Sequence, residues 1–237
     1  GSAGTTAAGE YLKKLYPTHK LAVSEASQCP TLLSNGFGGH RIEGIGDKHV
    51  PWIHNLRDTD MVIGVDDERT MRLFRLFNEP AGRDYLKERG VDPAVVDQLD
   101  ALGISSICNV IAAMKFAKYY ELGEENVVMT VFTDSEALYT SRLAELSKER
   151  GPYTRDNAVA DFELLDQVGT DSLQELRYED RKRIHNLKYY TWVEQQGKTL
   201  DEINAQWYER DYWENINALR PQLDKMIGEF NERVKAL

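Results

Sequence analysis

The amino end of the chain carries the feature that most constrains its local fold. A helical pattern over residues 6–14 follows directly on a run of small residues, Gly1, Ser2, Ala3, Gly4 and Thr5. Small residues let the backbone approach an anion, which unpaired N–H groups and the positive end of a helix dipole then stabilise. The sequence therefore predicts a phosphate-binding turn at residues 1–5, with an ordinary helix-entry turn as the alternative.

Strand-like and helix-like segments alternate along the first 150 residues. Apolar and β-branched residues at 20–25, 60–65 and 126–132 are typical of buried strands, and helical patterns begin near Asp66 and after Ser106. Residues 78–101 have a helical pattern and are expected to form an inserted helical segment. The alternation predicts an α/β domain over residues 1–150, with an open, twisted, mainly parallel sheet flanked by helices.

Residues 151–237 are richer in charge and helical pattern. Thr199 and Glu202 have the spacing of a capping box, and Pro221 begins a final helix with an apolar stripe. A cluster of tryptophans and tyrosines precedes that helix and is expected to lie in a core or a subunit interface. We therefore predict a helical C-terminal extension over residues 151–237.

Several short motifs occur in a fixed order along residues 1–150. They are the small-residue turn, Gly39-His40-Arg41-Ile42-Glu43-Gly44-Ile45-Gly46, the strand 60–65 with Asp66-Asp67-Glu68, Gly103-Ile104-Ser105-Ser106, and residues 127–135 ending in Asp134-Ser135. In this order they resemble the C-terminal half of the cysteine synthase-like, fold type II enzymes that use pyridoxal 5'-phosphate (PLP), a group that includes tryptophan synthase beta-like proteins. The resemblance implies the large-domain portion of that fold.

The resemblance assigns cofactor contacts to particular residues. It implies that the backbone of Gly1, Ser2, Ala3, Gly4 and Thr5 holds the phosphate, that Ser105 meets the pyridine nitrogen, and that Asp134 and Ser135 form a turn near the ring. A hydroxyl does not hold the nitrogen protonated, so the ring would favour expulsion of a β-substituent. Without the resemblance, Ser105 and Ser106 are ordinary helix N-caps and Asp134 belongs to an Asx turn.

The substrate side is assigned in the same way. Gly44 and Gly46 match a mobile glycine loop near the substrate in the family, although a plain flexible turn has the same residues. His49 lies beside this loop and is a candidate for binding a substrate carboxylate. Because His40, His49 and His54 have spacings that match no standard ligand pattern, we predict no metal site.

No lysine of this chain matches the family's Schiff-base lysine, which lies upstream of the phosphate turn, so no catalytic residue is assigned. The expected function is that of the C-terminal portion of a PLP-dependent lyase or transferase, which catalyses β-elimination or β-replacement on a small amino acid. A missing N-terminal segment or a complementary chain would supply the lysine. The alternative is a non-catalytic α/β module that binds a phosphate or cofactor. A nucleotide-binding Rossmann-like domain is disfavoured, because only Glu25 supports it.

Composition restricts the partners and the location. A net charge of −10 argues against a nucleic-acid surface, and no apolar run approaches the roughly 20 residues that span a bilayer. Cys29 and Cys108 form no disulfide framework, which favours a reducing cytoplasm. A homodimer is expected from the family resemblance.

Overall fold

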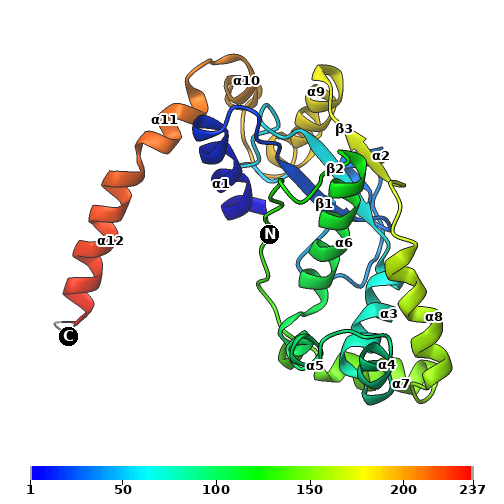
Figure 1. Ribbon diagram of the computed structural model, residues 1–237. Coiled ribbons are helices and arrows are strands. Elements are labelled where there is room, and N and C mark those ends of the chain that lie inside the picture. The colour runs from blue at the N-terminus through cyan, green and yellow to red at the C-terminus, as the bar shows by residue number, and fades with distance from the viewer. Residues whose placement is uncertain (1, 236–237) are drawn as a thin grey trace.

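The computed structural model describes the backbone of residues 2–235 and has a mixed α/β architecture (Figure 1). Its sheet contains β1 (Ala22–Ala26), β2 (Met61–Val65) and β3 (Leu173–Glu175), in that spatial order. β1 and β2 are parallel, with Ala22 opposite Met61, and β3 is antiparallel to β2. The predicted α/β class and the predicted strands near 20–25 and 60–65 are confirmed.

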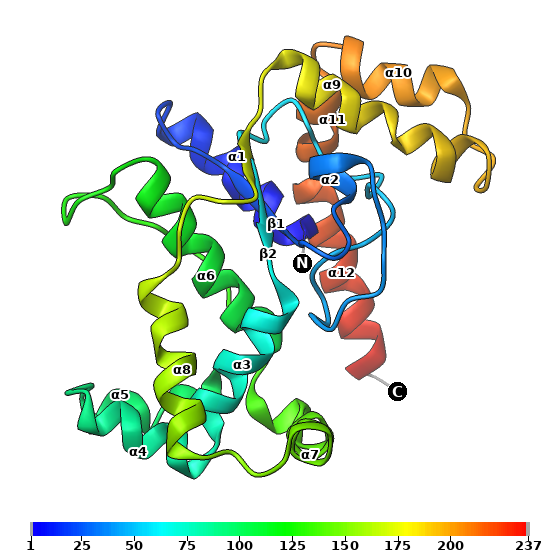
Figure 2. The ribbon, with the colours of Figure 1, turned by 90° about the vertical axis from the view of Figure 1, so that its right-hand side faces the viewer.

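Helices cover both faces of this small sheet. Figure 2 shows α6 (Ile104–Tyr119) on one side of β1 and β2 and the short α2 (Thr31–Ser34) on the other. α3 (Asp67–Asn78) packs against α6, and Asp66 caps it by accepting the backbone N–H of Arg69 at 2.8 Å. The core between α3 and α6 contains fully buried side chains that include Phe74, Leu73, Ile107 and Ile111.

A group of helices encloses the far end of α3. The predicted helical segment at residues 78–101 forms α4 (Pro80–Glu88), α5 (Pro93–Val96) and a 3-10 turn at Leu99–Ala101. A second 3-10 turn at Glu136–Leu138 precedes α7 (Thr140–Arg150), and α8 (Arg155–Asp166) packs on α3 and α4. α8 and β3 come after residue 150 in the chain and still pack in this core. The domain boundary at residue 150 stays a prediction.

The C-terminal segment is helical. It contains α9 (Tyr178–Asn186), a π-turn at Tyr189–Val193, α10 (Leu200–Tyr208), α11 (Tyr212–Ala218) and α12 (Arg220–Lys235). The first part packs on the sheet through a second cluster of buried residues, Val50, Leu56, Val62, Leu176, Ile184 and Trp207. By contrast, α12 leaves the body as an arm (Figure 1), and all its described side chains are exposed. None of the helices within the described residues is long and apolar enough to cross a membrane.

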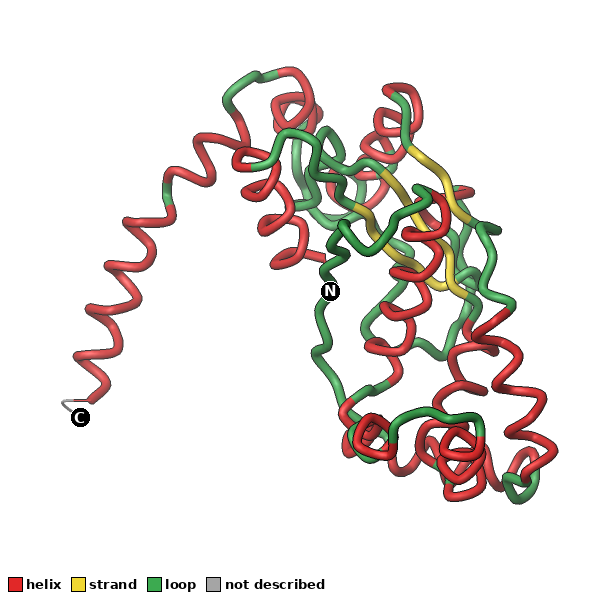
Figure 3. Tube along the Cα trace, in the orientation of Figure 1, coloured by secondary structure: helices red, strands yellow, loops and turns green. Residues whose placement is uncertain are grey.

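The predicted strand at 126–132 is wrong. Figure 3 shows this segment as an extended loop between α6 and α7, and Val127 and Met129 are 84% and 77% exposed. A β-branched sequence becomes a strand only beside a partner strand, and none among the described residues pairs with this segment. Its connection to α6 includes a hydrogen bond of 2.9 Å from Asn109 Nδ2 to the carbonyl of Val131.

The amino end also differs from its prediction. α1 (Ser2–Leu15) begins at Ser2, so Ser2, Ala3, Gly4 and Thr5 form the first turns of a helix and not a turn before one. Three alanines and the residues Glu10 to Leu15, mostly good helix formers, favour the helix. Gly1 and the side chains of Ser2 and Ala3 lie outside the described part of the chain.

Candidate functional site

The first turn of α6 is held by the carboxylate of Asp134. Its two oxygens accept the backbone N–H groups of Ser105 at 2.8 Å and Ser106 at 2.9 Å, and the hydroxyl of Ser106 donates to it as well. Helix starts carry N–H groups without intrahelical partners, and a carboxylate also suits the positive end of the helix dipole. The cap of α6 is therefore Asp134, 28 residues downstream of Ser106, and not a serine at the helix start.

The environment of Asp134 keeps it ionised. Burial by itself would raise the pKa of Asp134, but the hydrogen bonds from Ser106 and Ser105 outweigh burial and lower it below its usual value. Gly103 is required beside this carboxylate, because a Cβ at that position would lie 2.5 Å from Asp134 Cγ. The turn thus contains a fixed negative charge on a rigid backbone.

Tyr139 completes this cluster. Its hydroxyl donates to Asp134 Oδ2 at 3.0 Å, and its ring packs edge-on against Phe74 with 6.1 Å between the ring centroids. Burial, followed by the hydrogen bond and the charge of Asp134, raises the pKa of Tyr139. Sequence reasoning missed Tyr139, and the available signal was only its position four residues after Ser135 at the start of a helix.

The glycine loop approaches the same turn. Gly44 has a φ of +82°, and a Cβ there would come within 3.9 Å of Ser105 Cβ. Gly46, with a φ of +94°, lies against the end of β1, where a Cβ would come within 3.2 Å of the nitrogen of Ala26. Positive φ favours glycine at both positions. The structure thus brings Ser105, Asp134 and Gly44 close together, and the roles predicted for them stay predictions.

The other predicted site residues make no described side-chain hydrogen bond to Ser105 or Asp134. His49 bonds to Asp47, with 2.9 Å between Nδ1 and Oδ1, and its side chain is 33% exposed. Ser135 is half-buried and makes no side-chain cap bond to the 3-10 turn that follows it. Gly4 and Thr5 are exposed on α1, and no described hydrogen bond connects them to Ser105. The roles predicted for these residues stay predictions.

The cysteines and the acidic and histidine residues offer no second reactive centre in the described part of the chain. Burial raises the pKa of Cys108 to about 12, which leaves its thiol protonated and unreactive. No group of three His, Cys, Asp or Glu side chains among the described residues has the geometry of a metal site. A cleft of about 350 Å³ lies near the other end of α6, and its lining includes Lys20, Tyr119 and Glu175 but none of the predicted site residues.

The Ser105 turn fits the cofactor contact that the resemblance implies. Ser105 is 6% exposed, Gly44 beside it has no side chain, and Asp134 occupies the space next to Gly103. Asp134 accepts the backbone N–H of Ser105, so the single O–H of Ser105 can serve an unprotonated pyridine nitrogen, which only accepts, when it turns away from Asp134. The first N–H groups of α1, within the described residues, have the character of an anion site.

Comparisons with known proteins found relatives that match part of the chain. No protein-family model matches the chain. Cysteine synthases of Staphylococcus aureus strains Mu50 and N315 are 30% identical to it over 142 residues, which is 60% of this chain and 40% of theirs. Cysteine synthase B of Campylobacter jejuni is 31% identical over 143 residues, with the same shares. The chain thus matches less than half the length of these curated relatives.

Among solved structures, a hydrogen sulfide-producing enzyme from Fusobacterium nucleatum has a TM-score of 0.43 and 24% sequence identity to the chain. The similarity covers 71% of this chain and 41% of that one. The sequence relatives confirm the predicted resemblance: 60% of the chain is similar to part of a cysteine synthase.

Proposed function

We propose that this cysteine synthase-like chain is the C-terminal portion of a PLP-dependent enzyme that performs β-elimination or β-replacement on a small amino acid. The observation that carries the proposal is the meeting of Ser105, Asp134 and Gly44 at the start of α6. These three come from separate motifs of the resemblance and are far apart in sequence. Their convergence supports a shared site and not three unrelated turns.

In this proposal each residue has a distinct task. Bound PLP supplies an electron sink for chemistry at the substrate's α-carbon. Ser105 would donate its hydroxyl hydrogen to the pyridine nitrogen, and Asp134 and Tyr139 keep its turn in place. The N–H groups at the start of α1, around Gly4 and Thr5, offer a site for the phosphate.

The proposed substrate-binding region is formed by the glycine loop at residues 44–49. Gly44 lies beside Ser105 without a side chain, whereas Gly46 packs closely against the end of β1 and fixes the course of the loop. His49 ends this loop, and its imidazole is partly exposed and able to bind a carboxylate. Exchange of His49 for alanine is therefore expected to raise KM for the substrate more than it lowers kcat.

The Schiff-base lysine is proposed to lie outside these residues. The buried amines of Lys115 and Lys188 each donate to three oxygen acceptors and are committed to the fold. The exposed, strand-like residues 126–132 have no partner strand among the described residues. Both observations support a further segment, from a longer chain or a second one, that pairs with the sheet and brings the lysine.

A non-catalytic binding module is the second candidate. Asp134 already satisfies the N–H groups at the start of α6, which is also what a purely structural helix cap does. In either case we expect the chain to act in the cytoplasm, and as a dimer, without nucleic-acid partners.

The test uses the purified enzyme that contains this chain. Borohydride reduction followed by mass spectrometry is expected to find PLP on a lysine outside residues 1–237. Ser105→Ala should shift the absorption of bound PLP and lower its affinity at least tenfold. Ser106→Ala is the matched control, because it removes only a hydroxyl that bonds to Asp134. Equal effects of the two variants, or no lysine adduct, would favour the non-catalytic module.

A further inference from the structure

The cleft of about 350 Å³ lies at the edge of the sheet where β1 and β2 begin. Lys20 precedes β1, Asp60 precedes β2, and Glu175 ends the antiparallel β3, so strand pairing brings these three residues to one edge. Arg177 and Arg181 join them from the start of α9. Three cations and two carboxylates therefore line one concave surface.

This cleft is separate from the candidate cofactor site. Tyr119, in the last turn of α6, lines the cleft, whereas Ser105 lies in the first turn of the same helix. At 1.5 Å of rise per residue, the two residues are about 21 Å apart along the helix axis. The predicted phosphate turn contributes no lining residue either. A small ligand in the cleft is therefore not the proposed cofactor in its own site.

Asp60 is already bound by donors of the protein. Its Oδ2 accepts the amine of Lys13 at 2.6 Å and the backbone N–H of Leu21 at 2.8 Å, and its Oδ1 accepts Arg181 Nη2 at 2.9 Å. Its side chain is 13% exposed. Two cations, Lys13 and Arg181, thus share the single negative charge of Asp60.

Glu175 is paired with Lys20. Its Oε1 accepts the amine of Lys20 at 3.1 Å and the hydroxyl of Tyr120 at 2.7 Å. An ammonium group has three donors, and the side chain of Lys20 is 44% exposed. Glu175 therefore balances the charge of Lys20 without using all of its donors.

Arg177 is the lining cation that has no carboxylate. Among the described residues no ion pair joins its guanidinium to an acidic side chain, and the residue is exposed. The nearby carboxylate of Asp180 instead accepts the backbone N–H of Arg177 at 3.0 Å and the amide of Gln174 at 2.7 Å. A guanidinium offers five N–H donors in a planar fork that matches phosphate and carboxylate oxygens. The cleft therefore has an excess of positive charge and of donors.

We propose that this cleft binds a small phosphate ester, with the phosphate group held by Arg177, Lys20 and Arg181. A ligand here must supply acceptors and negative charge, and a phosphate group carries three strong acceptor oxygens and nearly two negative charges at pH 7. The ring of Tyr119 provides a wall for the ester group, and the volume is in the range of small-molecule sites. A long polyanion is disfavoured by the net charge of −10. The proposal does not depend on the proposed function.

Titration of the full chain with phenyl phosphate, followed by amide NMR, tests this site. Shifts should appear at Lys20 and at the start of α9. Arg177→Gln should weaken binding at least about tenfold, because it removes charge-assisted hydrogen bonds. Arg233→Gln is the matched control, since it makes the same change of charge on the exposed α12, and it should leave the affinity unchanged.

Lys20→Gln gives an independent variant and should also weaken binding, which a role of Arg177 in the fold of α9 alone would not explain. The proposal is overturned if millimolar phenyl phosphate shifts none of these amides, or only those at the start of α1. Equal effects of Arg177→Gln and Arg233→Gln, or equally tight binding of succinate, would also overturn it. Failure of the chain's enzyme to bind PLP would overturn the proposed function but leave this titration unchanged.

Discussion

The core around α3 and α6 and the interface with the C-terminal extension bury charge in different ways. In the core, Lys115 meets Asp171 at 3.1 Å, and Arg72 meets Asp161 at 2.6 Å. At the extension, Lys188 has no carboxylate partner, and Glu10 on α1 is half-buried beside Asp58, a like charge. A buried charge with a partner holds its ionisation state, whereas one without a partner titrates near neutral pH. Stability should therefore depend on pH mainly through the extension.

The largest effect should come from the apolar core. Phe74 is fully buried, and Phe74→Ala is expected to lower the free energy of unfolding by about 3–5 kcal/mol, because it removes contacts and leaves a cavity. Urea denaturation at pH 6 and pH 8.5 should give the same loss. Phe37→Ala is the control, since Phe37 is 78% exposed. If the stability lost in Phe74→Ala changed strongly with pH, the core would not be the pH-independent region that the comparison requires.

The second-largest loss of unfolding free energy should come from the Asp134 cap at the start of α6. Asp134→Ala removes the acceptor for two backbone N–H groups and for Tyr139, and should cost about 1–3 kcal/mol of unfolding free energy at pH 7. Because the pKa of Asp134 is lowered in the folded state, its contribution is present above the ordinary value and is lost as pH falls through the lowered one. Asp134→Asn should retain part of the cap. Equal stability of wild type and Asp134→Ala would show that the cap is not needed.

Glu10 on α1, which faces Asn217 of the extension, tests the pH dependence expected at this interface. Burial, followed by the charge of Asp58, raises its pKa from 4.5 to about 7. The folded form binds more protons in this window, so wild-type stability should decline as pH rises from 4.5 to 7. Glu10→Gln should remove this decline and be more stable than wild type at pH 8 by about 1 kcal/mol.

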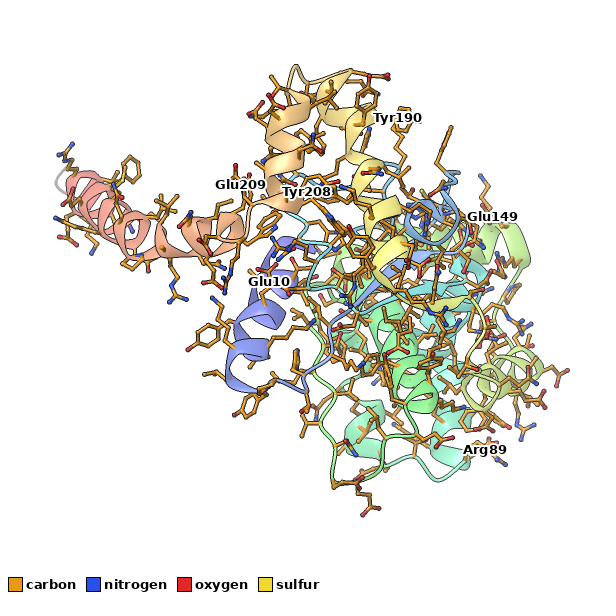
Figure 4. The ribbon with its side chains drawn as sticks, turned by 90° about the horizontal axis from the view of Figure 1, so that it is seen from above. Glu10, Arg89, Glu149, Tyr190, Tyr208 and Glu209 are labelled. Carbon is orange, nitrogen blue, oxygen red and sulfur yellow. The ribbon has the colours of Figure 1, made fainter. Side chains whose placement is uncertain are left out.

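The matched control for Glu10 is Glu209→Gln, on the exposed C-terminal side of α10. Figure 4 labels both carboxylates. Chemical denaturation between pH 4 and pH 8 measures the two variants together with wild type. The comparison fails if Glu10→Gln keeps the decline or if Glu209→Gln removes it.

The smallest effect should come from the arm. Phe230 on α12 is 65% exposed, so Phe230→Ser should change the unfolding free energy of the isolated chain by no more than about 0.5 kcal/mol. Thermal or urea unfolding of this variant beside wild type measures the change. A loss of 2 kcal/mol or more would mean that the arm packs against another surface in solution.

Some aromatic residues of the C-terminal segment are buried and others are exposed. Trp207 lies in the cluster at the sheet, as expected for a core residue, whereas Tyr190 and Tyr208 (labelled in Figure 4) are 59% and 67% exposed. Composition predicts that such a segment packs somewhere. It does not predict which rings face the core, because that depends on how the helices are arranged.

Local pattern by itself determined much of this protein. The helices at α1 and α3, the strands β1 and β2, and the capping box at Thr199 follow from periodicity and end signals that need no distant partner. The ordered motifs also identified the similarity of part of the chain to cysteine synthases.

Tertiary structure alone decided the rest. The strand-like residues 126–132 form a loop because a strand needs a partner for its backbone hydrogen bonds, and sequence pattern does not say whether that partner is present. The cap of α6 comes from Asp134 and not from an adjacent serine, since a carboxylate brought by a distant loop satisfies two N–H groups at once. The burial of Lys188 likewise depends on acceptors from two distant segments, which only the folded chain brings together.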